Sequence, residues 1–512
     1  MLTCNRRAVK VPASGVRIWI VILVGSLTAI LAAPLNAEPA RLHHYTVSID
    51  SELNIISVHA CFDGRPPLYL IAASLDAAAA LEQARIEGVR KPLEPNGAEL
   101  KLGAQPDNAC LVYRTDIGQF KSRHQRGGNP TRHVGRDLLT DLGVWFWRPD
   151  SLAPDEEIEI RFDLPAGISV SAPWRQAQAA DGSTVYWVGH SPYDWPAAVA
   201  FGHFDEQSIA VPGAVLRVAV LEGIPAVDLE LVRQWLTRAA TAVTTLYGSF
   251  PVANPQLLVV PGARGDEPVP WAYVLRGGAP SAHFFINQRR PASEFMTDWT
   301  AVHELSHLLL PYLRPEDAWL AEGTASYYQH VLRARSGMIA SAEAWQSLHS
   351  GFRRGMKSQP DTTLADATER MYKNGAFMRV YWEGAAIMLL ADQRLRSRTN
   401  GTQSLDSALR QLHECCVSSE TGWQAAEVFA KLDELTGTTV FRELYEANVD
   451  SEAFPDLTET YALLGLRVRA NAAMIDLDEG DATKVQLRDS IMGPPTTVQY
   501  PLRPAIDRIP AP

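Results

Sequence analysis

The chain has 512 residues, which is too long for one ordinary hydrophobic core and favours roughly two to four domains. Its hydrophobic content of 46% and charged content of 21% are those of a globular protein and exclude general disorder. Without the first 37 residues the chain holds 43 basic and 58 acidic residues, a net charge of −15. This acidic balance disfavours nucleic acid and anionic membrane surfaces as partners.

The N-terminal segment, residues 1–37, has the pattern of a secretory signal peptide. Four basic residues give it a positive start, and the apolar run 18–33 follows. This run of 16 residues is shorter than the roughly 20 that cross a bilayer as a helix. We therefore expect cleavage after Ala37 and a periplasmic or secreted protein. Leu35 is not the small residue preferred three positions before a cleavage site, so an uncleaved membrane anchor is the alternative.

A β-rich region follows, from about residue 41 to 205. Short runs of β-branched and aromatic residues are separated there by Gly, Pro and Asp, which predicts an antiparallel sandwich or saddle over residues 38–205. Trp145, Phe146 and Trp147 could form a platform for a sugar or pack inside this domain. Aromatic residues in a strand are usually core, which favours packing.

Four cysteines lie beyond the signal segment, and an even number in an exported chain is compatible with disulfides. Cys61 and Cys110 are the expected pair, within the N-terminal domain. The adjacent Cys415 and Cys416 could form a vicinal disulfide or could be buried thiols, and we expect buried thiols. Their spacing fits no recognised set of zinc ligands.

A mixed α/β pattern begins after residue 205. "DLELVRQWLTRAATAVTTLYG" predicts a helix that ends at Gly248. "PQLLVVPG" and "AHFFINQ" predict strands on either side of the Gly-rich turn "VLRGGAPS". From Asp298 the hydrophobic period is helical almost to residue 450.

These patterns predict a multidomain α+β chain. An α/β domain covers residues 206–395 and a helical domain covers 396–468. The polar, Pro-rich segment 469–512 is too short for a sizeable domain, so we expect one or two docked strands followed by disorder.

The stretch "TAVHELSHLLLPYL" contains the pattern H-E-x-x-H. On a helix, His303 and His307 lie on one face one turn apart, so both imidazoles can reach one zinc ion. Glu304 lies about 100° further round and is placed to take a proton from the attacking water. The alternative is a buried helix that carries these polar residues by chance. In either case Pro311 ends the helix.

Zinc held by two histidines needs one more protein ligand if a position is to stay open for water. Glu322 lies in a second predicted helix, "DAWLAEGTASYYQH", among apolar residues where a merely solvated charge is hard to explain. A helix that returns past the first would bring this carboxylate to the metal. We therefore predict His303, His307 and Glu322 as ligands of one Zn²⁺ per chain.

"VHELSH" followed by "WLAEGTASYY" resembles the gluzincin metallopeptidases. Between two branches, the glycyl aminopeptidase type is more similar than the aminopeptidase N type. "VYWEGAAIMLLADQRLRSRTNGTQSLDSALRQL" is similar to the helix pair after the active site of that type, and "FRELYEANVDSEAFPDLTETYALLGLRV" is similar to the end of its catalytic module. The resemblance covers roughly residues 41–468. It implies a thermolysin-like α/β zinc domain after the β domain, with Glu304 as general base.

The resemblance also implies a tyrosine, in a Y-x-x-G stretch, that donates a hydrogen bond to the oxyanion. Tyr372 in "MYKNGA" and Tyr381 in "VYWEGA" are the candidates. We choose Tyr381, because the sequence after it continues as the helix of the family does. For Tyr372 we expect simple packing.

Two features depart from the family. Relatives carry a Gly-Gly-x-Glu type of stretch on an edge strand that aligns the substrate. Here Gly277 and Gly278 are in place, but Pro280 or a neighbour stands where the acidic residue would be. A free α-amine then lacks its anchor, so the exo or endo mode stays open. His283, on the same presumed strand, is expected to line the cleft. The PDZ domain common in the glycyl aminopeptidase type is not expected, because the tail is too short for one.

The function predicted from the sequence is therefore an exported zinc-dependent peptidase that acts on a peptide or protein. A membrane enters only through the N-terminal segment, if that segment is not cleaved. The alternative is a non-catalytic envelope protein that keeps the fold as a binding or scaffold module. A third possibility is hydrolysis of an amide in another kind of substrate.

Overall fold

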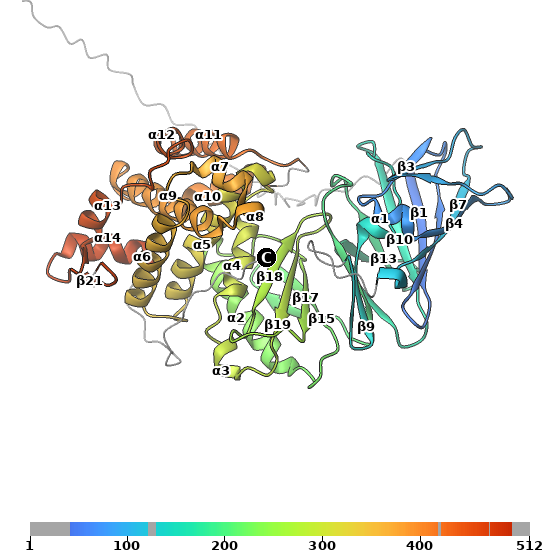
Figure 1. The fold of residues 1–512 in the computed structure, drawn as a ribbon, viewed down its shortest axis with the longest axis horizontal. Helices are drawn as coiled ribbons and strands as arrows, with labels where there is room; N and C mark the ends of the chain where they lie inside the picture. The colour runs from blue at the N-terminus through green and yellow to red at the C-terminus, as the bar shows by residue number, and fades with distance from the viewer. Residues whose placement is uncertain (1–40, 121–129, 418–420, 471, 494–512) are drawn as a thin grey trace, which may run out of the picture. The chain divides into compact units, whose positions relative to one another are not determined.

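The computed structural model describes residues 41–120, 130–417, 421–470 and 472–493 (Figure 1). Over these residues the protein is α+β: sheets come first in the chain, a sheet with helices follows, and the C-terminal part is helical. The predicted signal segment, residues 1–37, lies outside the described residues. Among the helices of the described part of the chain, none combines the length and the apolar character needed to cross a membrane.

Three sheets make up the N-terminal part. Their strand orders are β12-β13-β10-β1-β2-β7-β4, β11-β14-β9-β8 and β3-β6-β5. Paired strands are antiparallel with the exception of β1 and β10, which run parallel, so the antiparallel prediction is wrong for that pair. The elements are β1 (Arg41–Ile49), β2 (Ile55–Cys61), β3 (Tyr69–Ile71), α1 (Asp76–Ala80), β4 (Leu81–Ile86), β5 (Pro95–Asn96), β6 (Glu99–Lys101), β7 (Cys110–Asp116), β8 (Thr131–Val134), β9 (Asp137–Asp141), β10 (Glu156–Asp163), β11 (Ser169–Ser171), β12 (Arg175–Gln178), β13 (Thr184–Val188) and β14 (Ala198–Gly202).

Aromatic side chains fill the core of this part. Trp145, Phe146 and Trp147 are 0%, 5% and 0% exposed, in a cluster that also includes Tyr45 and Trp174. A ring must be accessible to stack on a sugar. The burial therefore confirms packing and excludes the sugar platform.

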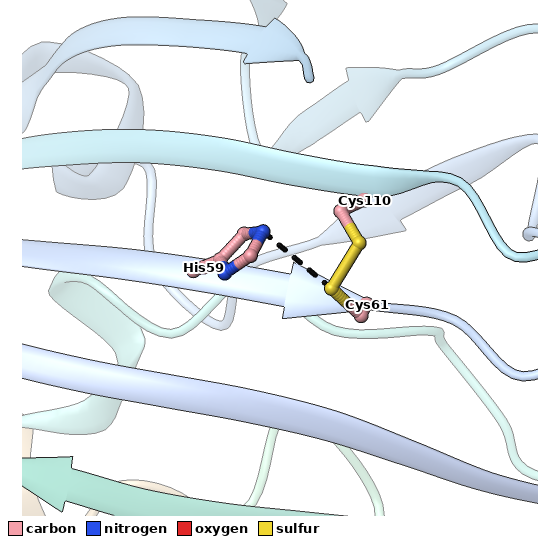
Figure 2. A group of neighbouring side chains, drawn as sticks. All are labelled: His59, Cys61 and Cys110. Atoms are coloured by element: carbon pink, nitrogen blue, oxygen red, sulfur yellow. Dashed lines mark hydrogen bonds between the residues drawn. A yellow bond between two sulfur atoms is a disulfide. The ribbon is translucent and has the colours of Figure 1, made fainter. Parts of the chain in front are cut away.

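Cys61 and Cys110 form the predicted disulfide, which joins β2 to β7 (Figure 2). His59 lies beside it, with Nε2 3.5 Å from Sγ of Cys61. Both sulfurs are in the disulfide, so this group offers no thiolate to a metal ion. Cys415 and Cys416 form a vicinal disulfide in the last turn of α10, where Cys415 is exposed to solvent, so the prediction of buried thiols is wrong.

A five-stranded sheet with the order β15-β16-β17-β19-β18 forms the middle of the chain (Figure 1). β16, β17 and β19 are parallel, and β15 and β18 add antiparallel edges. The predicted helix is α2, capped at its start by the Asp228 carboxylate and at its end by Gly248 in the left-handed conformation. The elements are β15 (Gln207–Val211), β16 (Ala214–Val220), α2 (Leu229–Tyr247), β17 (Gln256–Pro261), β18 (Trp271–Leu275) and β19 (Ser281–Ile286).

Helices occupy most of the chain from residue 292 to 464. Their apolar faces share one core with α2 and the central sheet. The domain boundaries near residues 205, 395 and 468 stay predictions. The helices are α3 (Ala292–Phe295), α4 (Thr300–Ser306), α5 (Ala318–Arg335), α6 (Ser341–Lys357), α7 (Leu364–Glu369), α8 (Met371–Asn374), α9 (Phe377–Arg398), α10 (Leu405–Cys416), α11 (Ala425–Thr436), α12 (Val440–Asn448) and α13 (Thr458–Leu464).

The segment after residue 468 contains more structure than its composition predicts. The elements are β20 (Leu466–Val468), its partner β21 (Ile475–Leu477), and α14 (Ala482–Met492). The docked strand confirms part of the prediction, but the helix corrects it. Arg488 of α14 donates to the carbonyls of Leu464 and Asp478 at 2.9 and 3.1 Å, which anchors the helix. Residues 494–512 lie outside the described residues.

Helices α5 and α9 meet where two glycines face each other. A Cβ on Gly323 would lie 2.4 Å from main-chain atoms of Gly384, and a Cβ on Gly384 would lie 2.3 Å from the carbonyl oxygen of Trp319. Glycine is the residue that allows this approach. The crossing brings Glu322 on α5 close to Tyr381 on α9.

We expect Gly384→Ala to lower the free energy of unfolding by about 1–3 kcal/mol, because the added methyl group overpacks the crossing. Denaturant unfolding measures this change. Gly189→Ala is the matched control: nothing lies within 4 Å of its Cβ position, so we expect a small change. Equal unfolding midpoints for the two variants would contradict the close packing of α5 on α9.

Candidate metal centre and active-site cleft

The two histidines of H-E-x-x-H lie on one side of a short helical run. α4 ends at Ser306, and the 3₁₀ turn η3 (His307–Leu309) continues it and stops before Pro311, as predicted. The ring centroids of His303 and His307 are 5.0 Å apart. The i, i+4 spacing therefore gives the shared face that the sequence indicates.

Glu322, near the start of α5, faces both histidines. Its Oε2 lies 3.3 Å from Nε2 of His303 and 3.6 Å from Nε2 of His307. The three candidate ligand atoms all lie within 4.8 Å of one another. The structure thus brings together the three residues that the sequence predicts as metal ligands.

The geometry of these atoms fits a zinc ion. Bonds of about 2.1 Å in tetrahedral coordination hold ligand atoms roughly 3.4 Å apart, close to both separations at Glu322. Nδ1 of His303 is 2.7 Å from Oε1 of Gln329, which leaves Nε2 of the same ring directed at Glu322. Two imidazole nitrogens and a carboxylate oxygen are a donor set that zinc takes in catalytic sites with an open fourth position.

Glu304 lies buried beside these ligands and lines the cleft. Burial raises the pKa of Glu304 to about 8, since desolvation outweighs the charge of His303, and Glu322 and Asp298 raise it further. A carboxyl group with a pKa in this range can accept and release a proton near neutral pH.

The two candidate tyrosines both line the cleft, in different settings. The Tyr381 ring is stacked with that of His303 at a centroid distance of 6.0 Å. Burial together with the nearby Glu322 carboxylate raises the pKa of Tyr381 well above its usual value. Tyr372 is 74% exposed and lies edge-on to Phe377. Tyr381 therefore contacts the predicted ligands, whereas Tyr372 lies at the rim.

The cleft has a volume of about 440 Å³, within the usual range for a ligand site. The edge strand β18 forms one wall, and α4, α5 and the start of α9 form others. Its lining residues include Trp271, Tyr273, Val274, Arg276, Trp299, Tyr312, Arg314, Ala318 and Phe377.

Gly277 and Gly278 do not line this cleft, which corrects their predicted placement as substrate-binding residues. The amide of Gly277 donates to the carbonyl of Pro196 at 2.9 Å. A Cβ on Gly278 would lie 2.2 Å from the carbonyl oxygen of Pro173. Both glycines pack closely against loops of the β-rich part.

His283 also lies elsewhere than predicted. It is on β19, an inner strand, whereas the edge strand is β18. The ring is fully buried, with Nε2 2.7 Å from Oγ of Ser281 and Nδ1 3.2 Å from the hydroxyl of Tyr273, and burial lowers the pKa of His283 to about 3. A neutral His283 therefore supports Tyr273, and Tyr273 is the residue that lines the cleft.

Three polar residues at the site were missed from the sequence. Gln329 holds the ring of His303, and Asp298 accepts hydrogen bonds from the Ala301 amide at 2.9 Å and the Trp235 indole at 3.3 Å, which fixes the start of α4. Arg276 is the third. Gln329 could have been found, because it follows Glu322 by seven residues and so lies on the same face of α5.

A family model described as M61 glycyl aminopeptidase matches residues 294–387. This segment contains α4, α5 and the first half of α9, with all the predicted ligands and both candidate tyrosines. The resemblance to the glycyl aminopeptidase type is thus confirmed over this segment. A comparison with curated proteins finds no match.

Several solved structures share the fold. An aminopeptidase N family protein from Idiomarina loihiensis aligns with a TM-score of 0.63 and 14% identity over 84% of this chain and 80% of its own. An M1 zinc metallopeptidase from Deinococcus radiodurans aligns with a TM-score of 0.52 and 14% identity over 81% and 94%. A mutant of the M1 zinc metallopeptidase from Deinococcus radiodurans, bound to a Tyr-Ser-Ala substrate, aligns with a TM-score of 0.51 and 15% identity over 81% and 94%. At such identities these likenesses establish the fold.

Proposed function

We propose that this protein is an exported zinc-dependent peptidase. The observation that carries the proposal is the convergence of one nitrogen each from His303 and His307 and one oxygen from Glu322, all within 4.8 Å, in the wall of a cleft. These residues would hold one Zn²⁺ per chain. The family match over residues 294–387 and the fold shared with zinc metallopeptidases support the same chemistry.

Zinc held by His303, His307 and Glu322 would supply Lewis-acid chemistry, which polarises a scissile carbonyl and acidifies an attacking water. Glu304 takes the proton from that water, because its carboxyl group lies buried beside the ligands without being one of them. The same group then returns the proton to the leaving amine. Tyr381 donates its hydroxyl proton in a hydrogen bond to the oxyanion that forms.

A peptide is the proposed substrate. The Tyr-Ser-Ala peptide bound to the similar Deinococcus mutant supports this substrate class. The exported location, periplasmic or secreted, rests on the pattern of residues 1–37 and on the disulfide between Cys61 and Cys110, since disulfides persist in oxidising compartments.

Turnover of a mixed peptide library by the purified chain tests this function. We expect cleavage that a metal chelator stops and added zinc restores. Stable peptides in the presence of bound zinc would instead support the alternative, a non-catalytic binding or scaffold protein. Cleavage that the chelator leaves unchanged would contradict the zinc mechanism.

Gln329→Leu should weaken zinc binding about 10- to 100-fold, because residues that orient a ligating histidine have effects of this size. Removing the amide oxygen frees Nδ1 of His303 and lets its ring turn. Competition with a chelating dye measures the affinity. Gln234→Leu, at an exposed position of α2, is the matched control and should bind zinc like the parent. Unchanged affinity in Gln329→Leu would show that this hydrogen bond does not orient the ligand.

A further inference from the structure

The cleft carries positive charge that the proposed reaction does not use. Among the described residues that line it, the charged or ionisable groups other than tyrosine are two histidines, two glutamates and two arginines. The histidines and glutamates belong to the proposed zinc set and base. Arg276 and Arg314 remain, and the described lining has no further carboxylate. A site of this composition favours an anionic group on its ligand over an ammonium group.

Arg276 follows directly on the edge strand β18 and is partly buried. Its Nη2 donates to the carbonyl of His307 at 2.6 Å and to that of Leu310 at 3.3 Å. Within the described part of the chain, Nε and Nη1 of this guanidinium have no acceptor, and no carboxylate lies within ion-pair distance. One edge of the guanidinium therefore remains available to a ligand in the cleft.

Two arginines of the helical part, by contrast, have carboxylate partners. Arg396 pairs with Asp392 at 2.9 Å, and Arg335 pairs with Asp406 at 2.8 Å. Arg276 is partly buried, so its charge has lost part of its hydration. A desolvated charge without a counter-ion is unfavourable, and a bound carboxylate would relieve that cost with two parallel hydrogen bonds.

Arg276 already has a structural role, because it caps the carboxyl end of the helical run formed by α4 and η3. A cation at the carboxyl end of a helix is favourable, and the two carbonyls it contacts need donors. This role uses Nη2 alone. It accounts neither for the free edge of the guanidinium nor for its position in the wall of the cleft.

We infer that Arg276 binds a substrate carboxylate near the scissile bond, so that the protein selects peptides with a free C-terminus or an acidic side chain there. The inference rests on the proposed peptidase function. Arg276 donates a hydrogen bond to the main chain of His307, and the ring of His307 faces the proposed metal position. The guanidinium therefore lies within roughly 10 Å of that position, which is the length of about three residues of extended chain.

Direct binding tests the inference independently of turnover. We would use the full chain with Glu304→Gln and zinc added, and measure peptide affinities by calorimetry. One pair of ligands is an alanine tetrapeptide with a free or an amidated C-terminus. The other pairs are acetylated and amidated alanine peptides with Glu or Gln at successive positions. The first pair tests the C-terminal carboxylate, and the others test a side chain.

We expect the carboxylate member of at least one pair to bind about 10- to 100-fold more tightly. Arg276→Gln should reduce this preference to less than about threefold, and Arg276→Lys should keep part of it. Arg233→Gln, the same change of charge at an exposed position of α2 paired with Glu230, should keep all of it.

If the chain with Glu304→Gln and an unchanged Arg276 binds both members of every pair equally, the inference is overturned. This outcome does not depend on whether the Arg276 variants fold. An equal weakening of both members by Arg276→Gln would also overturn it, because only the helix cap would then be lost. Failure of the proposed peptidase function is a different result: the parent chain, which keeps Glu304, would then not cleave peptides.

Discussion

Glu304→Gln should lower kcat/KM for peptide hydrolysis by a factor of about 10²–10⁴ and should keep its zinc, if the mechanism proposed above holds. The amide has nearly the shape of the carboxyl group but cannot take a proton from water. Glu304 is not among the three converging ligand atoms, so the metal site stays intact. Measurement of kcat/KM on a cleaved peptide, together with zinc content, checks both parts.

Glu316→Gln is the control for this change, since Glu316 is exposed and does not line the cleft. It should hydrolyse the peptide like the parent. If Glu304→Gln cleaves at the parent rate, Glu304 is not the base and the mechanism is wrong. Loss of zinc from that variant would instead make Glu304 part of the metal site.

Tyr381→Phe should lower kcat by about 10²–10³, because loss of one oxyanion donor costs about 3–4 kcal/mol of transition-state stabilisation. The hydroxyl group acts on charge that develops in the transition state, so KM should change little. The ring that is stacked with His303 is kept in this variant, which separates the hydroxyl from packing. Steady-state kinetics on one peptide measure the effect.

Tyr372→Phe is the matched control, because this tyrosine lines the same cleft but is 74% exposed at its rim. We expect a change in kcat of less than about threefold. The opposite pattern, with a large loss in Tyr372→Phe and a small one in Tyr381→Phe, would move the oxyanion donor to Tyr372. It would also show that the sequence context after Tyr381 is a poor guide.

The metal set could be predicted because its signals are local. The spacing of His303 and His307 needs only a helix to put both rings on one face, and the fold supplies that helix. Glu322 was predicted from an apolar setting that a solvated carboxylate does not explain. The structure places it 3.3 and 3.6 Å from the two rings.

Residues whose roles depend on distant contacts could not be predicted in this way. Gly277 and Gly278 match a family pattern, but they pack against loops about 80 and 105 residues earlier in the chain, at Pro196 and Pro173. Arg276, adjacent to them, has its hydrogen-bond partners at His307 and Leu310, and no sequence pattern marks that pairing.

Strand order was a second source of error. The prediction that His283 lines the cleft requires its strand to be the edge of the sheet, and a one-dimensional pattern does not give the order of strands in a sheet. The structure adds β18 outside β19, which buries His283 and exposes Trp271. α14 was missed for a related reason: its composition is polar, and its anchor is the nonlocal contact of Arg488 with Leu464.

Metal analysis of the purified chain, beside Glu322→Ala and His303→Ala, tests the central claim most directly. The account predicts close to one zinc ion per parent chain and a large loss of bound zinc in both variants. Equal zinc content in all three proteins, or none in the parent after zinc is supplied, would contradict it.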